Sequence, residues 1–150
     1  MRAAVFDLWN TLVAWPDKES RTLRRRWASL LGVTPERVDE LWYADGAYER
    51  RESGPIAAAL KEIHDAVGYA GGVDDVLGWR LDLARRALEP ADDVVAALEE
   101  LRRRGLATGL ISNCTEDVAL VWGESSLARL FRCRCLLGLG RGHEASSANL

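Results

Sequence analysis

Polar side chains that follow two apolar runs are the residues in this sequence best placed for chemistry. Asp7 comes directly after the first run, Ala3 to Phe6, and Asn10 and Thr11 follow shortly after it. A short apolar run bounded by turn residues is typical of a buried strand. Because open α/β folds bind ligands at the carboxyl ends of their strands, a carboxylate there is a candidate catalytic group. Taken alone, Asp7 has a plainer interpretation, since Asp and Asn commonly cap loops.

The second run strengthens the catalytic interpretation. Leu106 to Ile111 is apolar and ends in Ser112 and Asn113. A Ser-Asn pair by itself indicates an ordinary turn. Two predicted strands that each deliver polar groups at their carboxyl ends favour a shared site, provided that the two ends lie side by side.

Together the two motifs resemble the haloacid dehalogenase (HAD) superfamily of hydrolases. The first motif of that family is an apolar strand followed by Asp-x-Asp-x-Thr or a variant, matched here by residues 7–11. Its second motif is an apolar strand ending in Thr or Ser, matched by residues 111–113. The resemblance covers residues 1–13 and 90–131. It implies an α/β fold, with a Rossmann-like HAD core whose parallel sheet is incomplete and an inserted all-helical cap.

The resemblance also implies a role for each matched residue. Asp7 would be the nucleophile and form a covalent aspartyl intermediate, which divides one difficult displacement into two easier steps. Ser112 and the neighbouring backbone N–H groups would bind the anionic group of a small-molecule substrate. Asn113 would hydrogen-bond the substrate or orient Asp7, and Thr11 would brace the loop after the nucleophile.

Trp9 departs from the phosphatase form of the family, which places a second Asp there as general acid and base. An indole cannot transfer protons in that role, which contributes about 10²–10⁴-fold in rate. Its backbone carbonyl would still be available with Asp7 to ligate Mg²⁺, as in the family. The haloacid dehalogenases proper carry an aromatic residue at this position and use no metal, so dehalogenation is the alternative to phosphate hydrolysis. Trp9 and Asn10 are also candidate substrate or cap contacts, and Trp9 alone is equally consistent with a core residue.

Between the two motifs, four segments each carry one apolar stripe at helical spacing, which predicts a small helical bundle. The stripes are Leu23, Trp27, Leu30 and Leu31; Val38, Leu41 and Trp42; Ile56, Leu60, Ile63 and Val67; and Val76, Leu77, Leu81, Ala84 and Leu88. Gly32 is expected to end the first helix, and Thr34 to cap the second. His64 lies beside the third stripe and is interpreted as structural.

These patterns predict a core of residues 1–14 and 89–150 and a cap of residues 15–88. A crossover helix with Val94, Leu98 and Leu101 would make the two strands parallel, and short helices are expected over 116–122 and 125–130. Residues 132–142 follow neither helix nor strand periodicity, so 132–150 is interpreted as an anomalous tail. The third-motif Lys-Pro and the acidic fourth motif of the family are not visible, because Lys18 and Lys61 both precede the second motif. The chain is therefore expected to be truncated after the second motif.

A frameshift is one hypothesis for this tail. A back-translation of residues 132–150 in GC-rich codons, read one nucleotide later, gives a sequence similar to the third-motif region, Lys-Pro included. This back-translation is one of several that encode the same residues, because most amino acids have synonymous codons. Sequencing the gene across codon 131 tests the hypothesis.

Composition narrows the remaining function classes. The chain has 150 residues, of which 48% are apolar and 29% charged, as in globular proteins. A net charge of −3 predicts no general affinity for nucleic acid or anionic membranes. An odd number of cysteines in no disulfide pattern favours the cytoplasm.

Two further expectations follow from the missing motifs. The chain would be a catalytically dead fragment or a helical binding module if the absent Lys and acidic groups are essential. Parallel sheets are normally covered on both faces, so an incomplete sheet also predicts self-association.

Overall fold

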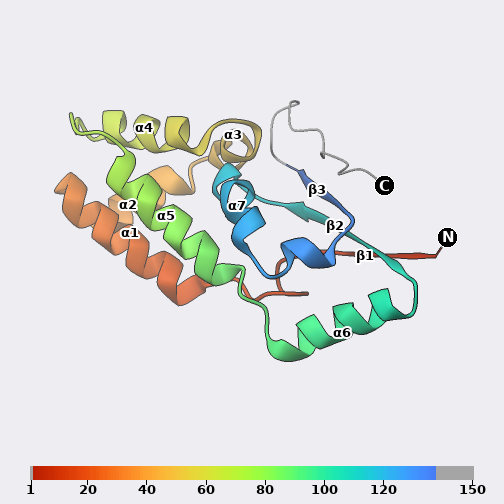
Figure 1. The fold of residues 1–150 in the computed structure, drawn as a ribbon. Coiled ribbons are helices and arrows are strands. Elements are labelled where there is room, and N and C mark those ends of the chain that lie inside the picture. Colours follow the sequence, from red (N-terminus) through yellow and green to blue (C-terminus); the bar gives the residue numbers. More distant parts are fainter. Residues whose placement is uncertain (1, 138–150) are drawn as a thin grey trace.

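The computed structural model describes residues 2–137, which form a mixed α/β structure with a three-stranded parallel sheet (Figure 1). The strands follow the order β1-β2-β3 in space. In chain order the elements are β1 (Ala3–Phe6), α1 (Asp17–Leu31), α2 (Pro35–Trp42), α3 (Ala47–Ser53), α4 (Ile56–Ala66), α5 (Asp74–Ala87), α6 (Asp92–Arg103), β2 (Ala107–Asn113), α7 (Glu116–Val121) and β3 (Cys133–Leu137). Two 3-10 turns, Trp122–Glu124 and Ala128–Leu130, lie between α7 and β3.

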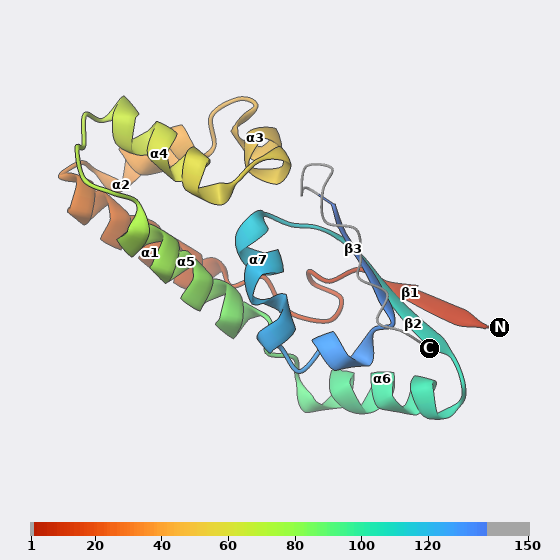
Figure 2. The ribbon, with the colours of Figure 1, turned by 45° about the horizontal axis from the view of Figure 1, so that its top comes forward.

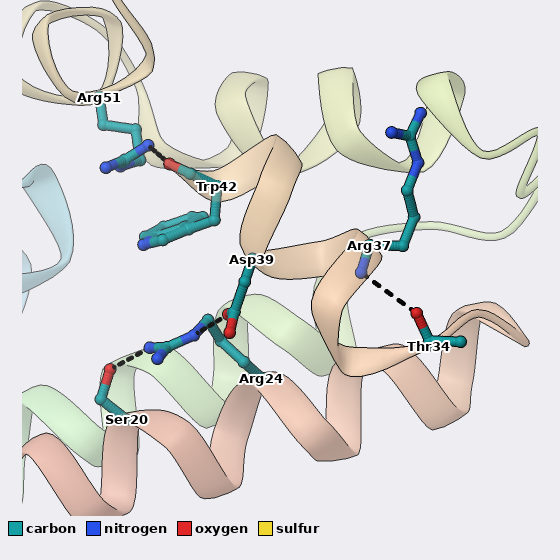
Figure 3. Close-up of polar contacts among 7 residues, drawn as sticks. All are labelled: Ser20, Arg24, Thr34, Arg37, Asp39, Trp42 and Arg51. Atoms are coloured by element: carbon teal, nitrogen blue, oxygen red, sulfur yellow. Dashed lines mark hydrogen bonds and ion pairs between the residues drawn. The ribbon is translucent and has the colours of Figure 1, made fainter. Parts of the chain in front are cut away.

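The predicted helix boundaries are confirmed where a cap or a stop signal marks them. Gly32 ends α1 in the left-handed conformation, with φ of 69°, which glycine adopts without steric cost. The Thr34 hydroxyl caps α2 and accepts a hydrogen bond of 3.3 Å from the backbone N–H of Arg37 (Figure 3). An ion pair of 2.5 Å between Arg24 on α1 and Asp39 on α2 joins the two helices.

The helices α1, α2, α4 and α5 enclose one hydrophobic cluster, referred to below as the helical cluster. Its fully buried members include Trp27, Val38, Leu60 and Val76. His64 is also fully buried, and its Nε2 accepts a hydrogen bond of 3.0 Å from Trp27 Nε1. The structural interpretation of His64 is therefore confirmed.

A second hydrophobic cluster, the sheet cluster, lies between the sheet, α6, α7 and the 3-10 turns. It includes Leu8, Leu98, Leu110, Trp122 and Leu130. In both ribbon views α6 and the segment after α7 lie on the same side of the sheet (Figure 2). On the opposite face Val5 is 61% and Ile111 48% exposed. The described residues thus cover one face of the sheet; the division into core and cap remains a prediction.

Two elements differ from the sequence-based expectation. The helix α3 was not predicted because it is short and buries only Ala47 and Arg51, which make no apolar stripe. The interpretation of residues 132–142 as irregular is wrong over β3, which pairs in parallel with β2 from Gly109 opposite Cys133 to Asn113 opposite Leu137. Pairing with β2 outweighs the poor strand pattern, since strand preference depends strongly on context. The rest of the predicted tail, 138–150, lies outside the described residues.

Contacts between the helices and the sheet region fix the position of α7. The Glu116 carboxylate at the start of α7 accepts a hydrogen bond of 2.9 Å from the backbone N–H of Ile56, the first residue of α4. Asp117 forms an ion pair of 2.6 Å with Arg80 on α5. Within the described residues, none of the helices combines the length and apolar character needed to cross a lipid bilayer.

Candidate functional site

The two predicted strands are adjacent and parallel, as expected, but β2 extends past the end of β1. β1 and β2 pair in parallel with Phe6 opposite Leu110, so Asp7 begins the loop where β1 ends. β2 continues beyond this point, and its last two residues, Ser112 and Asn113, pair with β3. The carboxyl ends of adjacent parallel strands therefore carry the polar residues of both motifs at one edge of the sheet, where α/β folds bind ligands.

The loop after β1 is a tight turn built on Leu8. The Leu8 side chain is fully buried, and its carbonyl accepts hydrogen bonds from the backbone N–H groups of Leu12 at 2.9 Å and Val13 at 3.2 Å. Asn10 has a left-handed φ of 58°, and its Oδ1 accepts a hydrogen bond of 3.3 Å from the Trp15 backbone. Asn10 thus holds the loop together, whereas Thr11, to which the family resemblance assigned this bracing, is exposed.

The predicted site residues differ in accessibility. Asp7 and Asn113 are exposed, and Trp9 is half-buried. Ser112 is only 2% exposed, and its Oγ has no hydrogen-bond partner among the described residues. Buried hydroxyls are normally hydrogen-bonded, so this orphan group is unusual.

A cavity of about 290 Å³ adjoins the two strand ends and unites three of the predicted residues. Trp9 and Asn10 line it from the loop after β1, and Asn113 lines it from the end of β2. Trp15, Tyr48, Cys114, Thr115 and Val118 complete its wall. Asp7, Thr11 and Ser112 do not line this cavity.

A second cavity of about 200 Å³ lies between the helices and α7. It shares Trp9, Trp15 and Tyr48 with the first cavity, so the two are neighbours along one aromatic wall. Arg51 and Arg80 line its far side. Sequence reasoning missed both arginines because each belongs to a charged segment that resembles a solvated helix surface. The aromatic residues that flank the first motif, above all Trp15, were the only available signal.

Two titratable side chains in the first cavity are held in their neutral forms. Burial raises the pKa of the Cys114 thiol to about 12, and the nearby Asp117 and Glu52 carboxylates add to this effect. A thiol with so high a pKa is a poor nucleophile. The adjacent Glu52 carboxylate favours the protonated phenol of Tyr48 and raises its pKa to about 12, together with burial. Tyr48 is therefore a hydrogen-bond donor at neutral pH.

The residues present do not make a recognisable Mg²⁺ site. In the part of the chain that the structure describes, no three His, Cys, Asp or Glu side chains gather closely enough to hold a metal ion. The predicted ligands reduce to the Asp7 carboxylate and the Trp9 carbonyl. Mg²⁺ requires six oxygen ligands in near-ideal octahedral geometry, so these two groups alone do not define its position.

Comparison of the chain with protein-family models and with curated proteins finds no match. The conclusions about function therefore depend on the motifs and on the geometry of the site.

Proposed function

We propose that the chain is a HAD-like hydrolase that attacks a small phosphorylated substrate through Asp7. The observation that carries the proposal is the placement of Asp7 and Ser112-Asn113 where two adjacent parallel strands end. Residues of the loops that follow these strands, and Asn113 itself, line one cavity.

The reaction proceeds in two displacements at phosphorus. An Asp7 carboxylate oxygen forms a bond to phosphorus while the ester oxygen leaves as an alkoxide or phenoxide and takes a proton from water. Water then attacks the phosphorus of the aspartyl phosphate, the bond to Asp7 breaks, and inorganic phosphate and free Asp7 result. The backbone N–H groups at the end of β2 would donate hydrogen bonds to the phosphoryl oxygens.

Trp9 determines which substrates react fast. Since Trp9 supplies no proton to the leaving group, esters with a stable leaving group should be hydrolysed best. We expect p-nitrophenyl phosphate to react about 10²–10⁴-fold faster than an alkyl phosphate, which needs a general acid.

The Asp7→Asn variant tests the role of the nucleophile. We expect it to lose at least about 10³-fold in the rate of phosphate release from p-nitrophenyl phosphate, because an amide oxygen is a poor nucleophile. Asp17→Asn is the matched control, since Asp17 is an exposed carboxylate at the start of α1 and should leave the rate unchanged. Equal rates in Asp7→Asn and the unmodified chain would refute the proposal.

Dehalogenation is the second candidate, and the position of Trp9 favours it. Trp9 packs edge-to-face against Trp15, with ring centroids 4.9 Å apart, and the pair forms an apolar wall in both cavities. A halide leaves carbon without a proton, so this reaction needs no acid in place of Trp9. Dehalogenation would be supported if the chain releases chloride from 2-chloropropionate and the Asp7→Asn variant does not. A chain inactive in both assays would instead be a binding module or an inactive fragment.

A further inference from the structure

Arg51 is a buried cation without a carboxylate partner among the described residues. It lies on α3 and is 5% exposed. One guanidinium nitrogen, Nη1, donates a hydrogen bond of 2.5 Å to the backbone carbonyl of Trp42, and the group lies 4.0 Å from the centroid of the Trp42 ring (Figure 3). A guanidinium has five N–H donors, so this contact leaves most of them available.

Arg80 brings a second cation to the same indole. Its guanidinium lies 4.6 Å from the Trp42 ring centroid, and its Nη2 forms the ion pair with Asp117. Its Nε is buried and has no partner among the described residues. Burial lowers the pKa of Arg51, and the charge of Arg80 lowers it further. Arg80 is thus paired with Asp117, whereas Arg51 has no ion-pair partner among the described residues, although buried charges are normally paired.

Both guanidinium groups line the smaller cavity together with Asp117, and aromatic and aliphatic side chains form most of its other walls. Trp9, Trp15 and Tyr48 line both this cavity and the one at the strand ends, so the two cavities adjoin. Together their volumes fall within the range of about 300–1,000 Å³ that is usual for small-molecule sites. A flat or apolar molecular body fits the aromatic wall, and an anionic group fits the end at which Arg51 has no ion-pair partner.

A purely structural role for Arg51 explains only part of this arrangement. Its bond to Trp42 satisfies a carbonyl in the last turn of α2, which would otherwise lack a partner. One donor is enough for that purpose. Arg80 has a structural role of its own in the ion pair with Asp117, but two guanidinium groups buried against one indole still repel each other, which costs free energy.

We propose that Arg51 and Arg80 bind an anionic group of the substrate, a carboxylate or a phosphoryl group, on a flat or apolar body that lies along Trp9, Trp15 and Tyr48. The inference deepens the proposed function, since it assigns the end of the substrate remote from Asp7. It makes Arg51 a specificity-determining residue.

The test measures binding alone and so is independent of turnover. Benzoate, phenylphosphonate and neutral benzamide are titrated into the full chain, with tryptophan fluorescence and calorimetry as readouts. We expect one of the anions to bind at least about 10-fold more tightly than benzamide, a difference of about 1.4 kcal/mol. Stronger binding of benzoate identifies a carboxylate site, and stronger binding of phenylphosphonate identifies a phosphoryl site.

Arg51→Met should abolish the preference for the anion, whereas Arg50→Met should retain it. Arg50 is the matched control because it lies on the same helix, but exposed, in an ion pair with Glu62. Arg51→Lys, which keeps the charge, should retain part of the preference. It is the variant to measure if Arg51→Met does not fold. Equal affinity for anions and benzamide in the unmodified chain would overturn the inference, as would a preference that survives in folded Arg51→Met. Phosphate release that fails while the anion preference holds would refute the proposed reaction and leave this site intact.

Discussion

The helical cluster and the sheet cluster differ in how completely their apolar side chains are covered. Trp27, Val38 and Leu60 are fully buried between helices that pack on one another. In the sheet, Leu110 is 1% exposed, whereas the next residue, Ile111, is 48% exposed. Among the described residues, the helical cluster is thus packed between helices, whereas one face of the sheet exposes apolar side chains.

This difference has a simple geometric cause. An amphipathic helix carries one apolar stripe, which neighbouring helices can bury completely. A parallel sheet has two apolar faces and requires a layer of helices on each. The described residues supply one such layer, α6 with the segment after α7. The smaller cavity lies at the boundary between the two clusters, since Trp42 of the helical cluster and Ala84 and Val118 of the sheet cluster line it.

Adjacent residues of β2 offer the strongest test of this comparison. Leu110→Ala should lower the free energy of unfolding by about 2–5 kcal/mol, because it removes buried methyl groups from a packed cluster. Ile111→Ala is the matched change on the other face, and we expect it to cost less than about 1 kcal/mol. Urea denaturation followed by tryptophan fluorescence measures both. Similar losses for the two variants would mean that both faces of the sheet are packed.

Much of the fold follows from periodicity and stop signals. The four apolar stripes, the Gly32 end of α1 and the Thr34 cap of α2 are local features, and the structure has helices at each of these places. The parallel pairing of the two motif strands follows from the crossover helix between them. The sequence did not predict β3, because this segment is a strand only through its pairing with β2. The alternation of Arg and Cys in residues 132–135 does not indicate that pairing.

The candidate site was predictable only at its strand ends. Asp7 and Ser112 follow apolar runs, a local pattern that can be read without a structure. Arg51 and Arg80 are separated along the chain and meet at Trp42 only through the packing of α3 and α5 against α2 and α7. The burial of the Ser112 hydroxyl likewise depends on the tertiary packing of β2.

The helical cluster should respond to pH through His64. Burial lowers the pKa of His64 below its ordinary value of 6.5, and the bond from Trp27 requires an unprotonated Nε2. Below pH 6.5 the unfolded chain therefore binds a proton that the folded chain does not, and folding stability falls as the pH decreases. Thermal unfolding between about pH 7.5 and about pH 5.5 should show a decreasing midpoint.

The His64→Gln variant separates this residue from the carboxylates, which also titrate in acid. A glutamine can still accept a hydrogen bond from Trp27 but does not take up a proton. We expect its unfolding midpoint to depend less on pH than that of the unmodified chain over the same interval. An unchanged pH dependence would show that other groups account for the acid sensitivity.

The smallest expected effect on stability, and the most specific to the open sheet face, is that of Ile111→Lys. The incomplete sheet predicts self-association, and Val5 and Ile111 expose apolar area on the face where such a contact would form. A lysine at position 111 would have to be desolvated in such a contact, so we expect at least about 10-fold weaker self-association with little change in unfolding. Sedimentation velocity over a range of concentrations measures this, with Leu120→Lys as control, since Leu120 is 58% exposed on α7. If Leu120→Lys weakens association and Ile111→Lys does not, the contact belongs to α7, and the monomer tolerates an open sheet face.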